Sequence, residues 1–364
     1  MTDRESPRRR RVHGVARPAL LAASVLLLSA CAGENNQNTF NPAGPSAHKI
    51  DNLFMPIAIA ATVVCVGVVV ATFVVSWRFR NRPGNENPRQ LHGSTALEIG
   101  WTVVPALVLA IIAVPTVSTI WTLSKEPTGD VLNVTVTGKQ WWWQYEYDRE
   151  KVVTANELVI PAGRPVRLEL KSDNVVHSFW VPELAGKQDV IPGRNQKLVI
   201  EADEPGLYKG QCAEYCGLAH ADMRLRVRAL SEADFRTWIR DQQQGPSQPY
   251  KGEIAELTGK RFECVNCHVF DDSSKAVYGP NLTHLRSRET FAGATEDLNR
   301  ENLIGWLLDA PSRVPMQAKR CRVGLAPDTD CVGMPSFTQH TPKGKPVMTR
   351  TEAETIADWL LEER

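Results

Sequence analysis

The stretch that decides the fold of this chain is Cys212-Ala-Glu-Tyr-Cys216-Gly-Leu-Ala-His220-Ala-Asp-Met223. It carries two thiols, an imidazole and a thioether, spaced so that one loop can turn all four toward one point. One Cys, one His and a weak Met are ligands of a single-copper electron-transfer site, and a further thiolate lets such a loop bridge two copper ions. A disulfide between Cys212 and Cys216, or a zinc site, is the alternative, although a thioether suits copper better than zinc.

The second histidine of such a site is His177, in Val175-Val-His177-Ser-Phe-Trp180-Val-Pro182. This apolar, β-branched stretch predicts a strand end. Taken alone, His177 is more often a core residue, but with the loop it completes a set of two His, two Cys and one Met. Short period-two segments separated by Gly and Pro predict a β-sandwich or barrel; they are Val131–Thr137, Val166–Leu170, Lys197–Ile200 and Met223–Arg228. Copper ligands from a late loop and an earlier strand fit a cupredoxin.

Two further motifs, Asp189-Val-Ile-Pro192-Gly193-Arg194 and Gly206-Leu-Tyr208-Lys-Gly210-Gln211-Cys212, stand between His177 and the copper loop. With them the chain, from about Asn52 to about Ile239, resembles subunit II of the haem–copper cytochrome c oxidases. The resemblance implies a binuclear copper centre, CuA, with six ligands: His177, Cys212, Glu214 through its carbonyl, Cys216, His220 and Met223. It also implies that the Glu214 carboxylate reaches a Mg²⁺ shared with subunit I.

Cys264-Val-Asn-Cys267-His268 has the pattern that attaches a c-type haem, in which two thiols form thioethers and the adjacent His ligates the iron. A redox dithiol or half of a zinc site is the alternative for the Cys pair alone. Gly279-Pro280-Asn281-Leu282 and Gly333-Met334-Pro335-Ser336-Phe337 follow. With them this stretch resembles a class I cytochrome c domain, which implies an all-α fold.

The resemblance implies that Met334 is the second axial ligand, because small cytochromes c carry that ligand at this place. A Met ligand raises the potential, as an electron-delivering haem requires. The segment from Met316 to Met334 is longer than such a domain needs, which leaves other residues as rivals: Met316, Met348 and His340. The same segment contains Cys321 and Cys331. In an oxidising compartment two nearby thiols most often form a disulfide, and two free thiols are the alternative.

The N-terminus has the layout of a signal peptide. Four arginines, Arg8 to Arg11, precede an apolar run from Ala19 to Leu28 that is too short to span a bilayer. The run ends in Leu28-Ser29-Ala30-Cys31, which resembles a bacterial lipobox. We therefore expect a signal peptide over 1–30, cleavage before Cys31 with lipid on its sulfur, and a polar tether over 31–51. An uncleaved signal with an incidental Cys is the alternative.

Two uncharged apolar runs, Asn52 to Trp77 and Ile99 to Ser124, exceed the roughly 20 residues that a spanning helix needs. They predict two transmembrane helices over 52–124. The loop 78–97 has four Arg side chains against Glu86, so the positive-inside rule places it in the cytoplasm and both flanking segments outside. The net charge of +1 gives no sign of a nucleic-acid partner, and we expect none.

Two residues take a role only from the resemblance. Glu98, in Leu97-Glu98-Ile-Gly-Trp101-Thr, matches a Glu at the mouth of a proton-uptake path into subunit I; the simpler interpretation is an acid that the helix dipole favours. In Trp141-Trp142-Trp143-Gln144-Tyr145-Glu146-Tyr147, strand alternation would bury half of the rings. The resemblance marks Trp141 as an exposed ring near CuA through which electrons enter, at the place where a tethered haem domain would dock.

The chain is thus predicted to be multidomain, with a transmembrane hairpin over 52–124, a cupredoxin domain over 125–240, a polar linker over 241–252 and a cytochrome c domain over 253–364. Capping boxes at Ser231-Glu-Ala-Asp234 and Thr351-Glu-Ala-Glu354 predict helix starts. Helical apolar spacing over Asn302–Leu308 and Thr351–Leu361 indicates helices in the last domain.

This layout resembles caa-type oxidases, in which cytochrome c is fused to subunit II. The resemblance implies an electron-entry subunit of a proton-pumping terminal oxidase, multi-pass in the bacterial cytoplasmic membrane, with both redox domains outside. Electrons would pass from cytochrome c or a cytochrome bc complex through haem c and CuA to the haem of subunit I, with subunit III as a further partner. The alternatives are the electron-input subunit of a nitric oxide reductase and a copper-binding module without turnover. Quinol oxidase subunit II shares the fold but lacks the copper ligands.

Overall fold

The structure is a computed structural model that describes residues 37–81, 83, 93–271, 278–316, 332–338 and 347–362. Several predicted features lie outside these residues: the signal peptide, the lipidated Cys31, most of the arginine-rich loop, the Cys321–Cys331 pair and His340.

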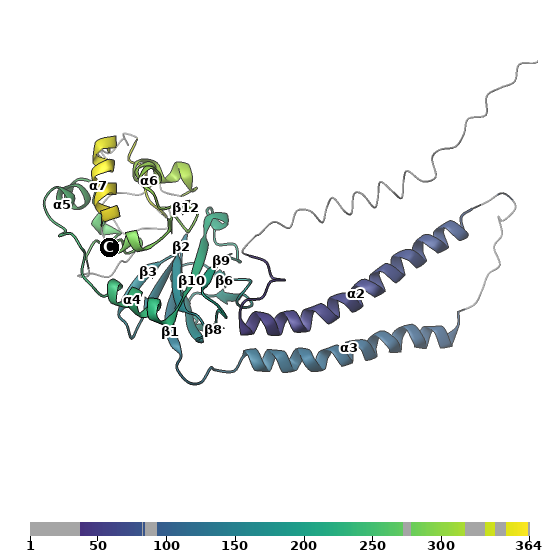
Figure 1. Ribbon diagram of the computed structural model, residues 1–364. Coiled ribbons are helices and arrows are strands. Elements are labelled where there is room, and N and C mark those ends of the chain that lie inside the picture. Colours follow the sequence, from purple (N-terminus) through teal and green to yellow (C-terminus); the bar gives the residue numbers. More distant parts are fainter. Residues whose placement is uncertain are drawn as a thin grey trace, which may run out of the picture. The chain divides into compact units, whose positions relative to one another are not determined.

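Two long helices precede the β structure: α2 (Pro45–Arg78) and α3 (Thr95–Leu123) (Figure 1). Both are long and apolar enough to cross a membrane. Helix α2 begins at Pro45 and not at Asn52. Proline favours the first turn of a helix because its fixed φ angle matches the helix and because an N–H at this place would have no partner within the helix. The large apolar side chains of both helices are exposed, as suits contact with lipid or with other membrane helices.

The middle of the chain is a sandwich of two five-stranded sheets, which confirms the predicted cupredoxin-like fold. One sheet has the strand order β3-β2-β1-β5-β8 and the other β4-β10-β9-β6-β7. The strands of the first sheet are β1 (Leu132–Lys139), β2 (Trp142–Tyr147), β3 (Val152–Ala155), β5 (Val166–Ser172) and β8 (Gln196–Ile200). Those of the second are β4 (Glu157–Pro161), β6 (His177–Trp180), β7 (Gln188–Val190), β9 (Gly206–Cys212) and β10 (Arg224–Leu230).

Alternating side chains build the sandwich core. In β5, Val166, Leu168 and Leu170 are fully buried while the residues between them face outward, as expected for a strand with one covered face. Strand β2 follows the same rule, because Trp143, Tyr145 and Tyr147 are buried and Gln144 and Glu146 between them are half-buried. The ring of Trp142 on the opposite face is buried as well, and so is the preceding Trp141, so all five rings of this stretch are buried. The prediction that alternation would bury only half of them is wrong. Of these rings, Trp142 contacts the C-terminal region, because its Nε1 donates to the Tyr278 carbonyl at 3.3 Å.

Helix α4 (Glu232–Gln242) follows the sandwich, and its predicted cap is confirmed: the Ser231 side chain accepts a hydrogen bond from the backbone N–H of Asp234 at 3.2 Å. The C-terminal region then has two main helices, α6 (Arg300–Arg313) and α7 (Arg350–Glu362). Its short elements are α5 (Glu253–Ala255), η3 (Glu256–Arg261), η4 (Cys264–Asn266), η5 (Leu285–Ser287), β11 (Thr290–Phe291) and β12 (Glu296–Asp297). Strands β11 and β12 pair antiparallel, so the all-α prediction is wrong for this hairpin.

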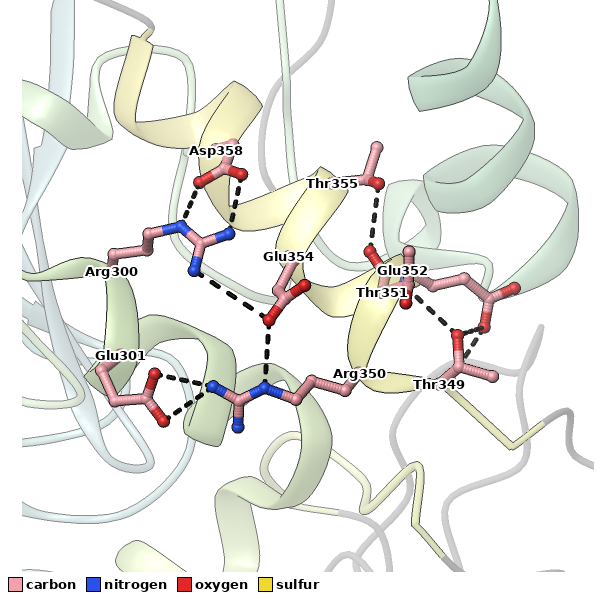
Figure 2. Close-up of polar contacts among 9 residues, drawn as sticks. All are labelled: Arg300, Glu301, Thr349, Arg350, Thr351, Glu352, Glu354, Thr355 and Asp358. Atoms are coloured by element: carbon pink, nitrogen blue, oxygen red, sulfur yellow. Dashed lines mark hydrogen bonds and ion pairs between the residues drawn. The ribbon is translucent and has the colours of Figure 1, made fainter.

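Helices α6 and α7 pack through buried apolar side chains, among them Leu303, Ile304, Ile356 and Leu360. Exposed ion pairs line the same contact (Figure 2): Arg300 Nε lies 2.6 Å from Asp358, and Arg350 Nη2 lies 2.8 Å from Glu301. Because exposed ion pairs typically contribute only about 0–1 kcal/mol each, the apolar contact carries most of the stability.

The N-terminal cap of α7 lies two residues before the predicted one. Thr349 Oγ1 accepts from the Glu352 N–H at 3.3 Å, and Glu352 Oε2 accepts from the Thr349 N–H at 2.8 Å (Figure 2). The capping box is therefore Thr349-x-x-Glu352. The predicted box starting at Thr351 is wrong because Thr351 already lies in the first turn, where its carbonyl accepts from Thr355 Oγ1.

Candidate metal centre

Two neighbouring strands bring the first copper donors together. His177 begins β6 and Cys212 ends β9, and the two strands pair antiparallel. Cys212 Sγ lies 3.8 Å from His177 Nδ1 and 3.8 Å from Cys216 Sγ. The donor atoms of His177, Cys212 and Cys216 all lie within 4.8 Å of one another, and all three residues are buried. Such a spacing of one imidazole and two thiols can enclose a metal ion.

The loop after β9 supplies the remaining donors. Cys216 Sγ lies 3.5 Å from His220 Nδ1 and 3.7 Å from Met223 Sδ. The 3-10 turn η2 (His220–Asp222) sets this geometry, and the Cys212 N–H donates to the Met223 carbonyl at 2.9 Å to close the loop. The structure therefore brings all the predicted side-chain ligands around the Cys212–Cys216 pair.

Glu214 presents its carbonyl to the same cluster, with Glu214 O 3.3 Å from Cys212 Sγ. Its side chain is turned to the backbone, where Oε1 accepts from the Tyr215 N–H at 3.3 Å. The carbonyl thus lies where the predicted sixth copper ligand belongs.

The two thiols are electrostatically unequal. Hydrogen bonds from Cys216 and then from His177 lower the pKa of the Cys212 thiol, against the effect of burial. The hydrogen bond to Cys212 and burial raise the pKa of Cys216. The two thiols therefore favour a state in which Cys216 keeps its proton and Cys212 is a thiolate. The thiolate is the form that binds copper.

Two amides that the sequence analysis did not identify orient these ligands. Asn174 Oδ1 lies 3.1 Å from His177 Nε2, which leaves His177 Nδ1 for the metal. Gln140 Nε2 donates to the Cys216 carbonyl at 2.7 Å, and Asn174 Nδ2 donates to Gln140 Oε1 at 3.2 Å. In the sequence, Gln140 stands directly before Trp141 and Asn174 stands three residues before His177. These positions alone do not reveal the hydrogen bonds.

Trp141 is not exposed, contrary to the prediction. Only 8% of it is accessible, and its Nε1 donates to the Cys216 carbonyl at 3.1 Å. It also lines a cavity of about 630 Å³ whose other walls come from the C-terminal region. Trp141 thus contacts the copper loop on one side and the cavity on the other, and the C-terminal region is what covers it.

This cavity brings together the predicted haem-binding residues. Cys264, Cys267 and His268 line it, as do Met334 and Met316. Apolar side chains make up much of the remaining wall, including Phe262, Phe270, Leu282, Leu303, Leu307 and Leu360. Met348 is buried in the core and is not among the lining residues.

The His268 ring is held by the backbone. Its Nδ1 lies 2.9 Å from the Pro280 carbonyl, which leaves Nε2 for a ligand. A Cβ at Gly279 would lie 2.5 Å from the ring, so glycine is required beside it. Burial lowers the pKa of His268 and raises that of Cys264 to about 12, so the imidazole and the thiol are both neutral.

The sulfur of Met316 contacts the turn that carries Met334. Met316 Sδ accepts from the Met334 N–H at 3.2 Å and would lie 2.6 Å from a Cβ at Gly333. The sulfur of Met316 is therefore engaged by the backbone of the Met334 turn.

Glu98, the remaining predicted site residue, lies in the first turn of α3, where the dipole favours an acid.

The sequence profiles of two protein families match this chain. Cytochrome C oxidase subunit II, periplasmic domain, matches residues 148–230, and the transmembrane domain of the same subunit matches residues 33–122. The chain is 38% identical to cytochrome c oxidase subunit 2 of Alkalihalophilus pseudofirmus, over 80% of this chain and 87% of that protein. It is 32% identical to quinol oxidase subunit 2 of Bacillus spizizenii, over 68% of this chain and 77% of that protein.

Among solved structures, the periplasmic domain of subunit II of cytochrome oxidase of Bradyrhizobium japonicum is 32% identical to this chain. It covers 32% of this chain and 96% of its own, with a TM-score of 0.31.

The two apolar helices, the sandwich and the buried Cys–His–Met cluster define a membrane-bound electron-transfer protein with its β domain outside the membrane. The chain belongs to the cytochrome c oxidase subunit II family. It is a subunit of an oxidoreductase complex, a haem–copper oxidase, and the periplasmic domain implies copper binding at CuA, where electrons enter.

Proposed function

We propose that this subunit carries a covalent haem c in its C-terminal region and that electrons pass from it to CuA inside the same chain. The observation that carries the proposal is the cavity of about 630 Å³, lined by Cys264, Cys267 and His268 on one side and by Trp141 and Trp142 on the other.

The cavity residues fit a c-type haem. The two thiols and the His268 ring share one wall, and the apolar lining suits a porphyrin. Arg288 also lines the cavity; it is buried and its Nε has no hydrogen-bond partner in the described part of the chain. A buried cation with an unused donor matches the carboxylates that a haem carries.

A bound c-type haem would supply a one-electron redox centre to this cavity. Cys264 and Cys267 would hold it covalently, and neutral His268 would offer Nε2 to the iron. Met334 is the proposed second axial ligand, because the sulfur of its rival Met316 already accepts a backbone N–H at 3.2 Å.

Trp141 connects the two sites. Its ring lines the cavity and its Nε1 donates to the Cys216 carbonyl, so this one side chain separates the cavity from a copper ligand. This placement supports a role of Trp141 in electron entry. The electron donor at Trp141 would then be the haem on the same chain and not an external protein.

Further parts of the proposed function rest on the family resemblance. The proposed six ligands of CuA are His177, Cys212, Glu214 through its carbonyl, Cys216, His220 and Met223, and the Glu214 carboxylate would reach a Mg²⁺ shared with subunit I. Cytochrome c or a cytochrome bc complex would donate electrons. Subunit I would reduce oxygen as the complex pumps protons, with Glu98 at the mouth of a proton path and subunit III as a further partner. The subunit would be multi-pass in the bacterial cytoplasmic membrane, with Cys31 lipidated after cleavage of residues 1–30.

The haem assignment is tested with the purified oxidase complex by denaturing gel electrophoresis and haem staining. The wild-type subunit should retain covalent haem, and the double variant Cys264→Ala, Cys267→Ala should lose it while keeping the EPR signal of CuA. Cys65→Ser is the matched control, because Cys65 is an exposed thiol of the membrane helix α2. A wild-type subunit without haem staining would show that the C-terminal region has another role.

A further inference from the structure

A buried carboxylate lies between the copper domain and the C-terminal region. Glu157, the first residue of β4, is only 1% exposed. Its Oε1 accepts from the Thr290 N–H at 2.7 Å and from Thr290 Oγ1 at 2.6 Å. The Glu289 N–H also donates to both carboxylate oxygens, at 3.0 and 3.1 Å. Every hydrogen bond described for this side chain comes from β11 and the residue before it.

The copper domain offers Glu157 little compensation of its own. Arg228 Nη1, from β10, lies 3.6 Å from Glu157 Oε2, and it donates at 3.0 Å to the Ser287 carbonyl of the C-terminal region. Without segment 287–290, the Glu157 carboxylate would lose its N–H and O–H donors. Hydrogen bonds to a carboxylate are stronger than those between neutral groups, so these contacts favour the docked arrangement of the two regions over one in which water replaces the donors.

Backbone contacts extend this attachment toward the cavity. The Arg224 N–H donates to the Gly293 carbonyl at 2.9 Å, and Trp142 Nε1 donates to the Tyr278 carbonyl at 3.3 Å. A Cβ at Gly293 would lie 2.4 Å from the Asp222 carbonyl, so only glycine permits this approach. Asp222 belongs to the turn η2 of the copper loop, and Gly293 lines the cavity.

We propose that Glu157 is a positioning residue that holds segment 287–293 on the copper domain and so keeps the haem-side cavity against Trp141 and Trp142. The electron-transfer part of this proposal rests on the proposed function, because it takes the cavity to hold haem c. The transfer moves one electron from the reduced haem to the oxidised copper centre, with no bond made or broken. Its rate depends steeply on the separation of the two sites, which Glu157 fixes without touching either one.

The test compares wild type with Glu157→Gln in the purified oxidase complex. The substitution keeps the side-chain volume but replaces an acceptor oxygen with an NH2 group among N–H and O–H donors. Hydrogen exchange at the Thr290 amide should accelerate about tenfold or more, as expected for the loss of a hydrogen bond to a charged group. After flash photoreduction of the haem, electron transfer to CuA should slow by a similar factor, with the spectra of both centres unchanged. Both midpoint potentials are measured in parallel, because the Glu157 charge also acts on Arg288 in the cavity wall and a change in driving force has to be separated from a change in distance.

Asp297→Asn is the matched control. It removes one carboxylate from the same contact, but Asp297 is 82% exposed and lies 3.8 Å from Arg226, so both rates should stay within about twofold of wild type. Unchanged exchange at Thr290 in Glu157→Gln, or unchanged electron transfer between intact centres, would overturn the proposal. A wild-type complex without covalent haem would refute the proposed function instead, and the exchange measurement would still decide whether Glu157 holds the two regions together.

Discussion

The copper loop and the haem-side cavity are built in opposite ways. The copper donors converge from two adjacent strands and one short loop, with Sγ–Sγ and Sγ–N separations below 4 Å. The cavity residues are spread from Lys139 to Leu360, on strands and loops of the copper domain and on turns and helices of the C-terminal region, and they surround a space of about 630 Å³. A sheet can preform a small metal site, whereas a site of haem size has to be assembled from segments far apart in the sequence.

The histidines of the two sites show the same contrast. Asn174, a side chain, orients His177, whereas the Pro280 backbone carbonyl orients His268. At the copper site one thiol has a lowered pKa, and at the cavity burial raises the pKa of both thiols. Because the thiolate is the form that binds a metal ion, the lowered pKa suits a copper ligand.

The largest effect is expected from Cys216→Ser, because Cys216 lies between Cys212, His220 and Met223. Loss of this thiol should abolish the two-copper EPR signal and oxygen consumption with reduced cytochrome c. The haem absorbance should persist, since the two sites share no ligand. Loss of both signals would show that the copper loop and the cavity fold as one unit.

A smaller effect is expected from Asn174→Ala, which frees His177 Nε2 and removes the support of Gln140. Loss of a partner that orients a metal-bound His typically reduces metal affinity by roughly 10–100-fold. Copper retention during dialysis against a chelator measures this change. Asp173→Ala is the neighbouring control, because Asp173 pairs with Lys139 and is exposed. Equal copper loss in both variants would contradict an orienting role for Asn174.

The smallest effect is expected from Thr349→Ala at the cap of α7. Loss of an N-cap side chain costs about 1 kcal/mol, so amide exchange in the first turn of α7 should accelerate by several-fold. Thr351→Ala, two residues later, should change stability by no more than about 0.5 kcal/mol. The opposite order would restore the capping box that the sequence predicted and contradict the observed one.

These differences explain how far the sequence could be interpreted. Cys212 to Met223 lie within one loop, so their types and spacing were enough to predict a copper site. Strand alternation in β5 likewise indicated its buried face. The burial of Trp141 and Trp142 was misjudged because both line the cavity whose other walls come from the C-terminal region. No local pattern shows which distant segment lies against a ring. The cap at Thr349 was missed because Thr349 and Thr351 each stand three residues before a glutamate. Only the residue at which the helix begins shows which of the two threonines is the cap.

The sequence alone was enough to predict the two apolar helices, the sandwich and a copper loop, because apolar length, strand alternation and the spacing from Cys212 to Met223 are each local patterns. Only the tertiary structure revealed Asn174 and Gln140 behind the copper ligands, the burial of Trp141, and Glu157 bound to Glu289 and Thr290. These depend on contacts between segments that are distant in sequence. A buried polar side chain shows its role only when its hydrogen-bond partners are known.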